Sequence, residues 1–209
     1  MEAAPQVQFH WELELGGMVV NESTEKLDLT GIPMTVEEMD AVLPYLLSLT
    51  YVDMTDCGIS SLVPLAGLKE LVTLDLSNNS IRDLSPLVNM VNLEELHLTY
   101  NAVRELGVAA SLPKLRVLDL SYNNLYAVPT IGNCTALEYL DLTHNKLSDI
   151  TSVGQLTNLT YFAAASNSLT DISTLAGCIH LTDLDISMYE SMVGKIDGTL
   201  EGAREKLSE

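Results

Sequence analysis

Aromatic residues, cysteine and basic residues are all scarce in this chain. Its 209 residues include two phenylalanines, one tryptophan, three cysteines and ten lysines and arginines, against 29 aspartates and glutamates. The formal charge of −19 excludes a surface of clustered basic side chains for phosphate, so nucleic acid is not an expected partner. A protein or peptide ligand of basic character is more compatible with this charge than an anionic one.

Long apolar runs are also missing. No stretch approaches the roughly 18 apolar residues of a membrane-spanning helix. The first five residues, Met1 to Pro5, have neither the basic nor the apolar region of a signal peptide. The sequence therefore predicts no membrane span, and it leaves open whether the protein is cytoplasmic or whether a targeting segment is absent from this chain.

The sequence is dominated by a repeat. An eleven-residue pattern has leucine at its first, fourth, sixth and eleventh positions and asparagine at its ninth, as in residues 115–125. The ninth position recurs every 22 residues, at Cys57, Asn79, Asn101, Asn123, Asn145, Asn167 and Tyr189. This period and pattern are the signature of a leucine-rich repeat solenoid, in which each repeat packs only on its neighbours. The predicted fold is α/β, with a curved parallel β-sheet on the concave face and short 3₁₀ or helical turns on the convex face.

Three parts are predicted along the chain. Residues 1–48 form an N-terminal cap, residues 49–190 carry the 22-residue repeats, and residues 191–209 form a C-terminal cap or a linker with a short polar helix over 199–207. The convex segments of the repeats are too short, and too rich in proline and serine, for long helices. Short 3₁₀ turns are expected there instead.

The N-terminal cap is predicted from three local signals. Apolar residues alternate with polar ones from Val7 to Leu15, and Gly16-Gly17 then precedes Met18-Val19-Val20, which indicates a β-hairpin in which Trp11 covers the end of the core. Residues 25–30 read as a degenerate first repeat strand. Thr35 and Glu38 form a capping box that opens a helix expected to reach about Leu47.

The cysteines are interpreted from their places in the repeat. Cys57 holds the asparagine slot, and Cys134 and Cys178 hold slots that leucine or methionine fills elsewhere, so all three are predicted as buried small hydrophobes. Cys134 and Cys178 lie two repeats apart, about 10 Å at the spacing of stacked strands, which is beyond disulfide reach. No disulfide is predicted.

Catalytic and metal motifs are not found. The four histidines have no metal-ligand spacing, and there is no glycine-rich phosphate loop, Gly-x-Ser-x-Gly elbow or Cys/His pair. Neither an enzyme nor a cofactor is expected. Calcium binding by the carboxylates and the oligomeric state are left open, with a monomer favoured.

The repeats resemble those of a known family. Their 22-residue length, and the turn Ile/Leu-x-Asp-Leu/Ile-Ser/Thr-Pro/Ser-Leu at residues 81–87 and 169–175, resemble bacterial internalin-type repeats. The hairpin-plus-helix start is similar to the cap of secreted or surface leucine-rich repeat proteins of Gram-positive bacteria. The resemblance covers roughly residues 7–190 and implies a bacterial interaction protein that is extracellular or on the cell surface.

Two alternatives to this interpretation remain. Phosphatase-regulatory leucine-rich repeat proteins of eukaryotes share the short-repeat class, which implies an intracellular adaptor. A structural spacer that presents another domain is the other alternative.

Function is expected on the outward positions of the strands. The fourth and sixth positions point into the core, so the third, fifth and seventh point out on the opposite face. Aspartate fills most of the fifth column, either as a structural filler satisfied by Ser and Thr across strands or as an acidic floor for a basic partner. Tyrosine and histidine gather on four consecutive repeats, which is typical of interface anchors. The candidate partner-binding residues of the concave face are Tyr51, Asp53, Asp75, Glu95, His97, Tyr100, Asp119, Tyr122, Tyr139, Asp141, His144, Tyr161, Asp183 and Asp185.

Overall fold

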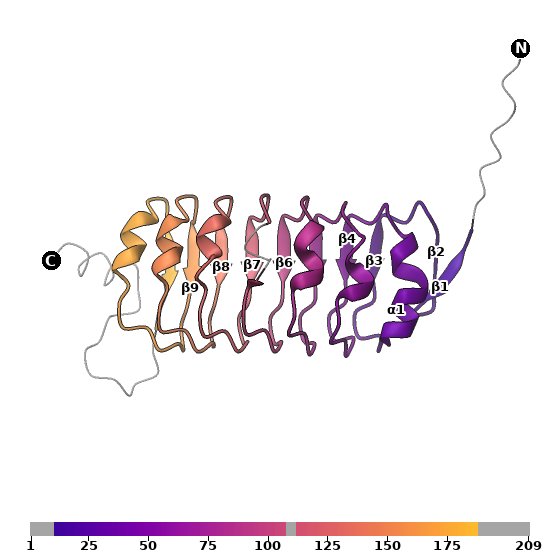
Figure 1. Cartoon of the computed structure of the whole chain (residues 1–209), viewed down its shortest axis with the longest axis horizontal. Coiled ribbons are helices and arrows are strands. Elements are labelled where there is room, and N and C mark those ends of the chain that lie inside the picture. Colours follow the sequence, from indigo (N-terminus) through magenta and orange to yellow (C-terminus); the bar gives the residue numbers. More distant parts are fainter. Residues whose placement is uncertain (1–10, 108–111, 188–209) are drawn as a thin grey trace, which may run out of the picture.

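The computed structural model describes residues 11–107 and 112–187. An eight-stranded parallel sheet runs along the molecule, with its strands in chain order from β3 to β10. Figure 1 shows these strands stacked along the long axis, with the helical turns on the other side of the solenoid. The strands are β3 (Lys26–Asp28), β4 (Tyr51–Asp53), β5 (Thr73–Asp75), β6 (Glu95–His97), β7 (Val117–Asp119), β8 (Tyr139–Asp141), β9 (Tyr161–Ala163) and β10 (Asp183–Asp185).

The register of the sheet follows the repeat. Each residue of β4 to β9 pairs with the residue 22 positions later on the next strand, as Asp119 pairs with Asp141. Lys26 of the first strand pairs with Tyr51, so the predicted degenerate repeat is part of the same sheet. The predicted parallel solenoid is confirmed. We call the outward face of the sheet its concave face.

The convex side consists of short 3₁₀ helices, as predicted. A 22-residue repeat leaves too little chain between strands for a longer helix, and proline or serine opens several of these turns. They are η2 (Val63–Leu65), η3 (Ser85–Asn89), η5 (Ile131–Asn133), η6 (Thr151–Gln155) and η7 (Ser173–Gly177). In the part of the chain that the structure describes, no helix has the length and apolar character to cross a membrane.

The N-terminal hairpin is present. Strands β1 (Leu13–Leu15) and β2 (Met18–Val20) pair antiparallel around Gly16-Gly17. Both glycines have positive φ, and a Cβ on Gly16 would lie 2.7 Å from Leu29 Cδ2, so this turn needs glycine. Trp11 packs against the core as expected, with its ring edge-on to Tyr45.

The predicted helix begins where expected but is shorter than predicted. The capping box forms, with the Thr35 N–H donating to Glu38 Oε2 at 2.8 Å and the Glu38 N–H donating to Thr35 Oγ1 at 3.2 Å. Helix α1 (Val36–Val42), however, ends five residues before Leu47, and the 3₁₀ helix η1 (Leu43–Tyr45) follows. Pro44 explains the early end, because it has no N–H to donate and its ring clashes with the preceding turn.

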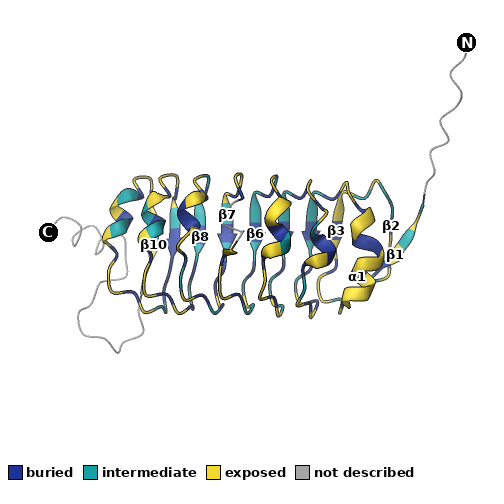
Figure 2. Cartoon of the chain, in the orientation of Figure 1, coloured by how far each residue is buried: buried dark blue, intermediate teal, exposed yellow. Residues whose placement is uncertain are grey.

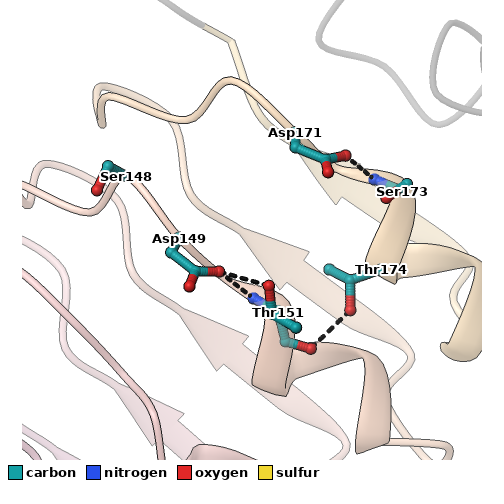
Figure 3. A pocket seen from close by; sticks show the side chains of 6 residues that line it. All are labelled: Ser148, Asp149, Thr151, Asp171, Ser173 and Thr174. Atoms are coloured by element: carbon teal, nitrogen blue, oxygen red, sulfur yellow. Dashed lines mark hydrogen bonds between the residues drawn. The ribbon is translucent and has the colours of Figure 1, made fainter.

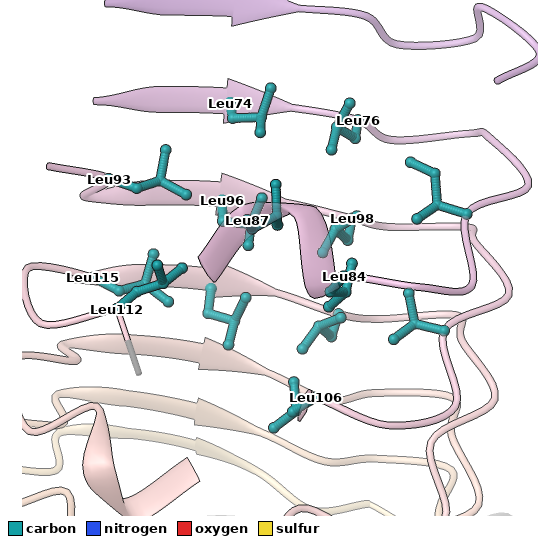
Figure 4. Packing of buried hydrophobic residues seen from close by; sticks show 14 of the residues in the cluster. Leu74, Leu76, Leu84, Leu87, Leu93, Leu96, Leu98, Leu106, Leu112 and Leu115 are labelled. Atoms are coloured by element: carbon teal, nitrogen blue, oxygen red, sulfur yellow. The ribbon is translucent and has the colours of Figure 1, made fainter. Parts of the chain in front are cut away.

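The core is a continuous column of leucines. The pattern leucines of residues 115–125, namely Leu115, Leu118, Leu120 and Leu125, are all fully buried. Equivalent leucines of successive repeats lie above one another (Figure 4), and the buried side of each turn faces this column (Figure 2). Burial of each such side chain stabilises the fold by about 1.5–3 kcal/mol.

The asparagine column closes the bend after each strand. Asn123 Nδ2 donates to the carbonyls of Leu98, Leu120 and Ser121 at 2.8–3.1 Å, and its Oδ1 accepts the Val103 N–H at 2.9 Å. These bonds satisfy backbone groups that the bend would otherwise bury unpaired. The same set of bonds is made by Asn79, Asn101, Asn145 and Asn167.

The cysteines are buried thiols, as predicted. In the asparagine slot, Cys57 Sγ donates to the Leu29 carbonyl at 3.1 Å. Burial raises the pKa of both the Cys134 and the Cys178 thiol to about 11. The predicted C-terminal cap or linker at 191–209, Tyr189 of the asparagine column and residues 7–10 of the hairpin lie outside the described residues.

Candidate functional site

The register places the candidate residues in straight columns on the concave face. The third-position column starts at Lys26 and continues through Tyr51, Thr73, Glu95, Val117, Tyr139, Tyr161 and Asp183. The fifth-position column runs through Asp28, Asp53, Asp75, His97, Asp119, Asp141, Ala163 and Asp185. Neighbours within a column are about 4.8 Å apart, so side chains that are 22 residues apart in sequence are in contact.

The aspartates of the fifth column have a local structural role. Asp119 Oδ1 accepts the N–H of Ser121 at 2.9 Å, and Asp141 Oδ1 accepts that of Thr143 at 2.8 Å. Asp28, Asp53, Asp75 and Asp185 make the same bond. The partner therefore lies two residues further along the same chain segment, and the expectation that Ser and Thr of neighbouring strands satisfy these carboxylates was wrong. The reason is geometric, because the chain turns directly after each aspartate and brings that N–H to it.

The column remains electrostatically unfavourable near its C-terminal end. Burial raises the pKa of the Asp141 carboxyl; the two bonds from Thr143 oppose this shift, and the charges of Asp119 and Asp185 add to it. From β4 to β10, no lysine or arginine occupies the third, fifth or seventh position of the described repeats. The negative charge of the column is therefore not neutralised by cations on the same face.

Aromatic side chains form two separate stacks. The outer stack consists of Tyr100, Tyr122 and His144, whose successive ring centroids are 4.2 Å apart at interplanar angles of 20° and 22°. The strand stack consists of Tyr139 and Tyr161, 4.3 Å apart at 5°. Tyr100 is 52% exposed and Tyr122 38% exposed, so the outer stack offers aromatic surface to solvent. Such rigid, amphipathic rings are typical interface anchors.

The outer stack lies on an unusual backbone. The residue before each member of the asparagine column, including Cys57 in its first slot, has φ between 52° and 57°, in the left-handed region. These residues are Asp56, Asn78, Tyr100, Tyr122, His144 and Ser166. Asparagine and aspartate tolerate this conformation, whereas a bulky tyrosine there is an outlier that costs about 1–2 kcal/mol. Strain of this kind is concentrated at functional sites, which favours a role for these tyrosines beyond folding. Asp56 and Asn78 in the same slot are the sequence signal for this conformation, because aspartate and asparagine tolerate it.

The strand stack is more enclosed. Burial raises the pKa of the Tyr139 hydroxyl, the charge of Asp141 raises it further, and the hydroxyl is hydrogen-bonded to that of Tyr161. The two rings therefore form one rigid unit beside the acidic column. Because its pKa is raised, the Tyr139 hydroxyl keeps its proton, and the two rings offer a contact surface rather than an acid group.

The structure separates the remaining candidates from these stacks. Tyr51 shares the third column with Tyr139 but lies four strands away on β4, together with Asp53. Asp75, Glu95 and His97 lie on β5 and β6, between those two strands. Among the described residues of the concave face, the aromatic side chains that contact one another belong to the repeats of β6 to β9. In residues 11–107 and 112–187, no three His, Cys, Asp or Glu side chains are placed to hold a metal ion.

An ion-pair cluster beside the third column was missed from the sequence. Arg116 makes a two-pronged contact with Glu138, with Nε–Oε1 at 3.0 Å and Nη2–Oε2 at 2.8 Å, and its Nη1 lies 3.8 Å from Glu94 Oε2. The hydrogen bonds and charge of Glu138 raise the pKa of the Arg116 guanidinium. The 22-residue spacing of Glu94, Arg116 and Glu138 was the available signal.

A surface hollow of about 530 Å³ lies away from the concave face, where the chain enters η6 and η7 (Figure 3). Asp149 accepts the Thr151 N–H at 2.7 Å, and Asp171 accepts the Ser173 N–H at 2.8 Å. Thr174 Oγ1 donates to the Thr151 carbonyl at 2.7 Å. These groups are engaged in shaping the turns, so the hollow is not a candidate ligand site.

A parallel sheet of short repeats with an open outward face defines a leucine-rich repeat solenoid, a fold typical of protein-binding modules. The family model described as Leucine Rich repeats (2 copies) matches residues 47–89, 69–112, 91–129 and 113–155. Together these segments cover more than half of the chain, which therefore belongs to the leucine-rich repeat family. No curated protein matches the sequence.

Two of the similar solved structures are internalins. Internalin C2 of Listeria monocytogenes is similar with a TM-score of 0.72 and 26% identity, over 79% of this chain and 74% of that one. The internalin inlF of the same species has a TM-score of 0.59 and 22% identity, over 79% of this chain and 62% of that one. A leucine-rich repeat protein of Leptospira interrogans has a TM-score of 0.58 and 21% identity, over 78% of this chain and 55% of that one. The predicted internalin-like repeat protein is thus confirmed.

Proposed function

We propose that this protein is a non-enzymatic protein- or peptide-binding module of a bacterial cell surface or secretome, and that its concave face over β6 to β10 engages the partner. The observation that carries the proposal is the pair of aromatic stacks on a rigid sheet. The outer stack keeps tyrosine on a left-handed backbone that disfavours it. The likeness to internalins supports the bacterial surface or secreted role.

The test uses replacements that the chain itself supplies. Asn78 occupies the left-handed slot of Tyr122, and Thr73 occupies the strand slot of Tyr139, so Tyr122→Asn and Tyr139→Thr suit the local backbone. Tyr126, which is 52% exposed like Tyr100 but lies outside the outward columns, provides the control Tyr126→Asn.

The immobilised full chain is used to capture partners from the native environment, and each captured protein is then purified. Its Kd is measured by biolayer interferometry for the wild type and the variants. Loss of an anchor costs about 1–2 kcal/mol, so the Tyr122→Asn/Tyr139→Thr pair should weaken binding at least tenfold, and Tyr126→Asn less than twofold. An unchanged Kd for the pair would rule out the concave stacks as the binding surface.

The proposed location has its own test. Protease added to intact cells should digest a surface-displayed chain, and a secreted chain should be found in the medium. Detection only inside protease-treated cells would contradict the surface or secreted role and favour the intracellular adaptor.

A further inference from the structure

The two stacks flank a strip of carboxylates. We call the fifth-column residues Asp119, Asp141, Ala163 and Asp185, on β7 to β10, the acidic lane. The strand stack lies along one side of the lane, two residues earlier in each repeat. The outer stack lies along the other side, three residues later. Both stacks have a member in the repeat of β8, Tyr139 in the strand stack and His144 in the outer stack. Their Cα atoms are separated by five residues of chain, which corresponds to about 15 Å.

Among the described residues of β7 to β10, no lysine or arginine stands at an outward position beside the lane. The nearest arginine by position, Arg116 at the rim, is engaged by Glu138 and Glu94. Asp141 lies between Asp119 on β7 and the small side chain of Ala163 on β9, and Asp185 follows on β10. A cation brought into the lane would therefore meet several carboxylates and would not need to displace a lysine or arginine from them.

We propose that the partner contributes one extended, cationic polypeptide segment, which lies along the acidic lane between the two aromatic stacks and directs arginine or lysine side chains to Asp119, Asp141 and Asp185. This inference rests on the proposed function and specifies the chemistry of its partner. An α-helix, 10–12 Å across with its side chains, would fill the width of about 15 Å. An extended chain leaves room for its side chains to reach the carboxylates and to stack on the tyrosines, which arginine does well.

The dimensions set the length of the segment. From β7 to β10 the lane is about 14 Å long, because neighbouring strands are about 4.8 Å apart. An extended chain advances about 3.3 Å per residue, so four or five residues cover it. A probe of eight residues with alternating basic side chains therefore spans the whole lane.

The probe is a fluorescein-labelled peptide of four Arg-Ser repeats, and its counterpart has four Glu-Ser repeats. Binding to the full chain is followed by fluorescence anisotropy in 50 mM and 200 mM salt. The Arg-Ser peptide should bind and should weaken as salt screens the charges, whereas the Glu-Ser peptide should not bind. Failure of the Arg-Ser peptide to bind would overturn the inference.

A matched pair of double variants locates the binding. Asp141→Asn with Asp185→Asn removes two charges from the lane, and Asp149→Asn with Asp171→Asn removes two from the opposite side (Figure 3). All four aspartates accept an N–H two residues on, and asparagine keeps that acceptor, so both proteins should fold. Two charge pairs with the peptide are lost in the lane variant, which should bind the Arg-Ser peptide on the order of tenfold more weakly, whereas the control should bind it less than twofold more weakly.

The outcomes separate the inference from the proposed function. Equal weakening by both double variants would mean that the peptide responds to overall charge, and the inference would fail. A native partner whose binding depends on Tyr122 and Tyr139 but not on Asp141 and Asp185 would also overturn the inference, with the proposed function intact. Lane-dependent peptide binding together with tyrosine-independent partner binding would instead refute the proposed function.

Discussion

Glycine is ordinarily less stabilising than alanine in a folded chain, but the left-handed backbone at Tyr122 predicts the opposite order for replacements at this position. Its φ of 54° brings a Cβ close to the following carbonyl oxygen, at a cost of about 1–2 kcal/mol for any residue but glycine. Glycine in turn loses more chain entropy on folding than alanine, by about 0.5–1 kcal/mol. Tyr122→Gly should therefore be more stable than Tyr122→Ala by about 0.5–1 kcal/mol. Both variants lack the ring and its stacking contacts, so that loss cancels in the comparison.

Thr73 supplies the matched control, since it lies in strand β5 of the same sheet. There the entropy cost alone operates, and Thr73→Ala should be more stable than Thr73→Gly by about 0.5–1 kcal/mol. Free energies of unfolding are measured by urea titration of all four variants, followed by circular dichroism. In a chain of this size, each 1 kcal/mol also moves the Tm by about 2–4 °C. Equal or greater stability of Tyr122→Ala relative to Tyr122→Gly would refute the left-handed conformation and the strain argument built on it.

Two further predictions concern the asparagine and aspartate columns. Asn123→Ala should destabilise the fold by about 3 kcal/mol or more in urea titration, because it leaves buried carbonyls and the Val103 N–H without their partner. The half-buried Asn124 makes a side-chain bond to Lys146 at the surface, so Asn124→Ala should cost less than about 0.5 kcal/mol. Folding raises the pKa of the Asp141 carboxyl, so the folded state binds its proton more tightly than the unfolded state does. The free energy of unfolding should therefore fall as pH rises from the ordinary pKa of 3.8 through the raised one. Asp141→Asn should remove this contribution and be more stable than the wild type at pH 7, and an unchanged dependence of stability on pH would contradict the prediction.

Much of the fold could be predicted because the repeat ties position to geometry. Once Leu118 and Leu120 are assigned to the core, the alternation of a strand places Val117 and Asp119 on the other face. The role of Asn123 followed from the same grid. The end of α1 was missed because the helical spacing of apolar residues was given more weight than Pro44, which stops the hydrogen-bonding pattern.

The candidate site was only partly predictable. The sequence indicated that Tyr100, Tyr122, Tyr139 and Tyr161 share one face, because that depends on their positions within the repeat. It did not show that they divide into two stacks, because ring contacts depend on side-chain directions and on the turn of the backbone at the eighth position. The sequence also did not show that each aspartate accepts the N–H two residues later, because this bond depends on the turn of the backbone after the strand.

The sequence by itself determined the solenoid, its register and the residues on its outward face, since a strict 22-residue period leaves each strand one way to pair with the next. Only the tertiary structure decided how those outward side chains meet. The stacking of Tyr122 on Tyr100 and His144 and the enclosure of Tyr139 and Asp141 arise when neighbouring repeats pack at strand spacing. No single repeat contains these contacts, because each one joins residues that are 22 positions apart.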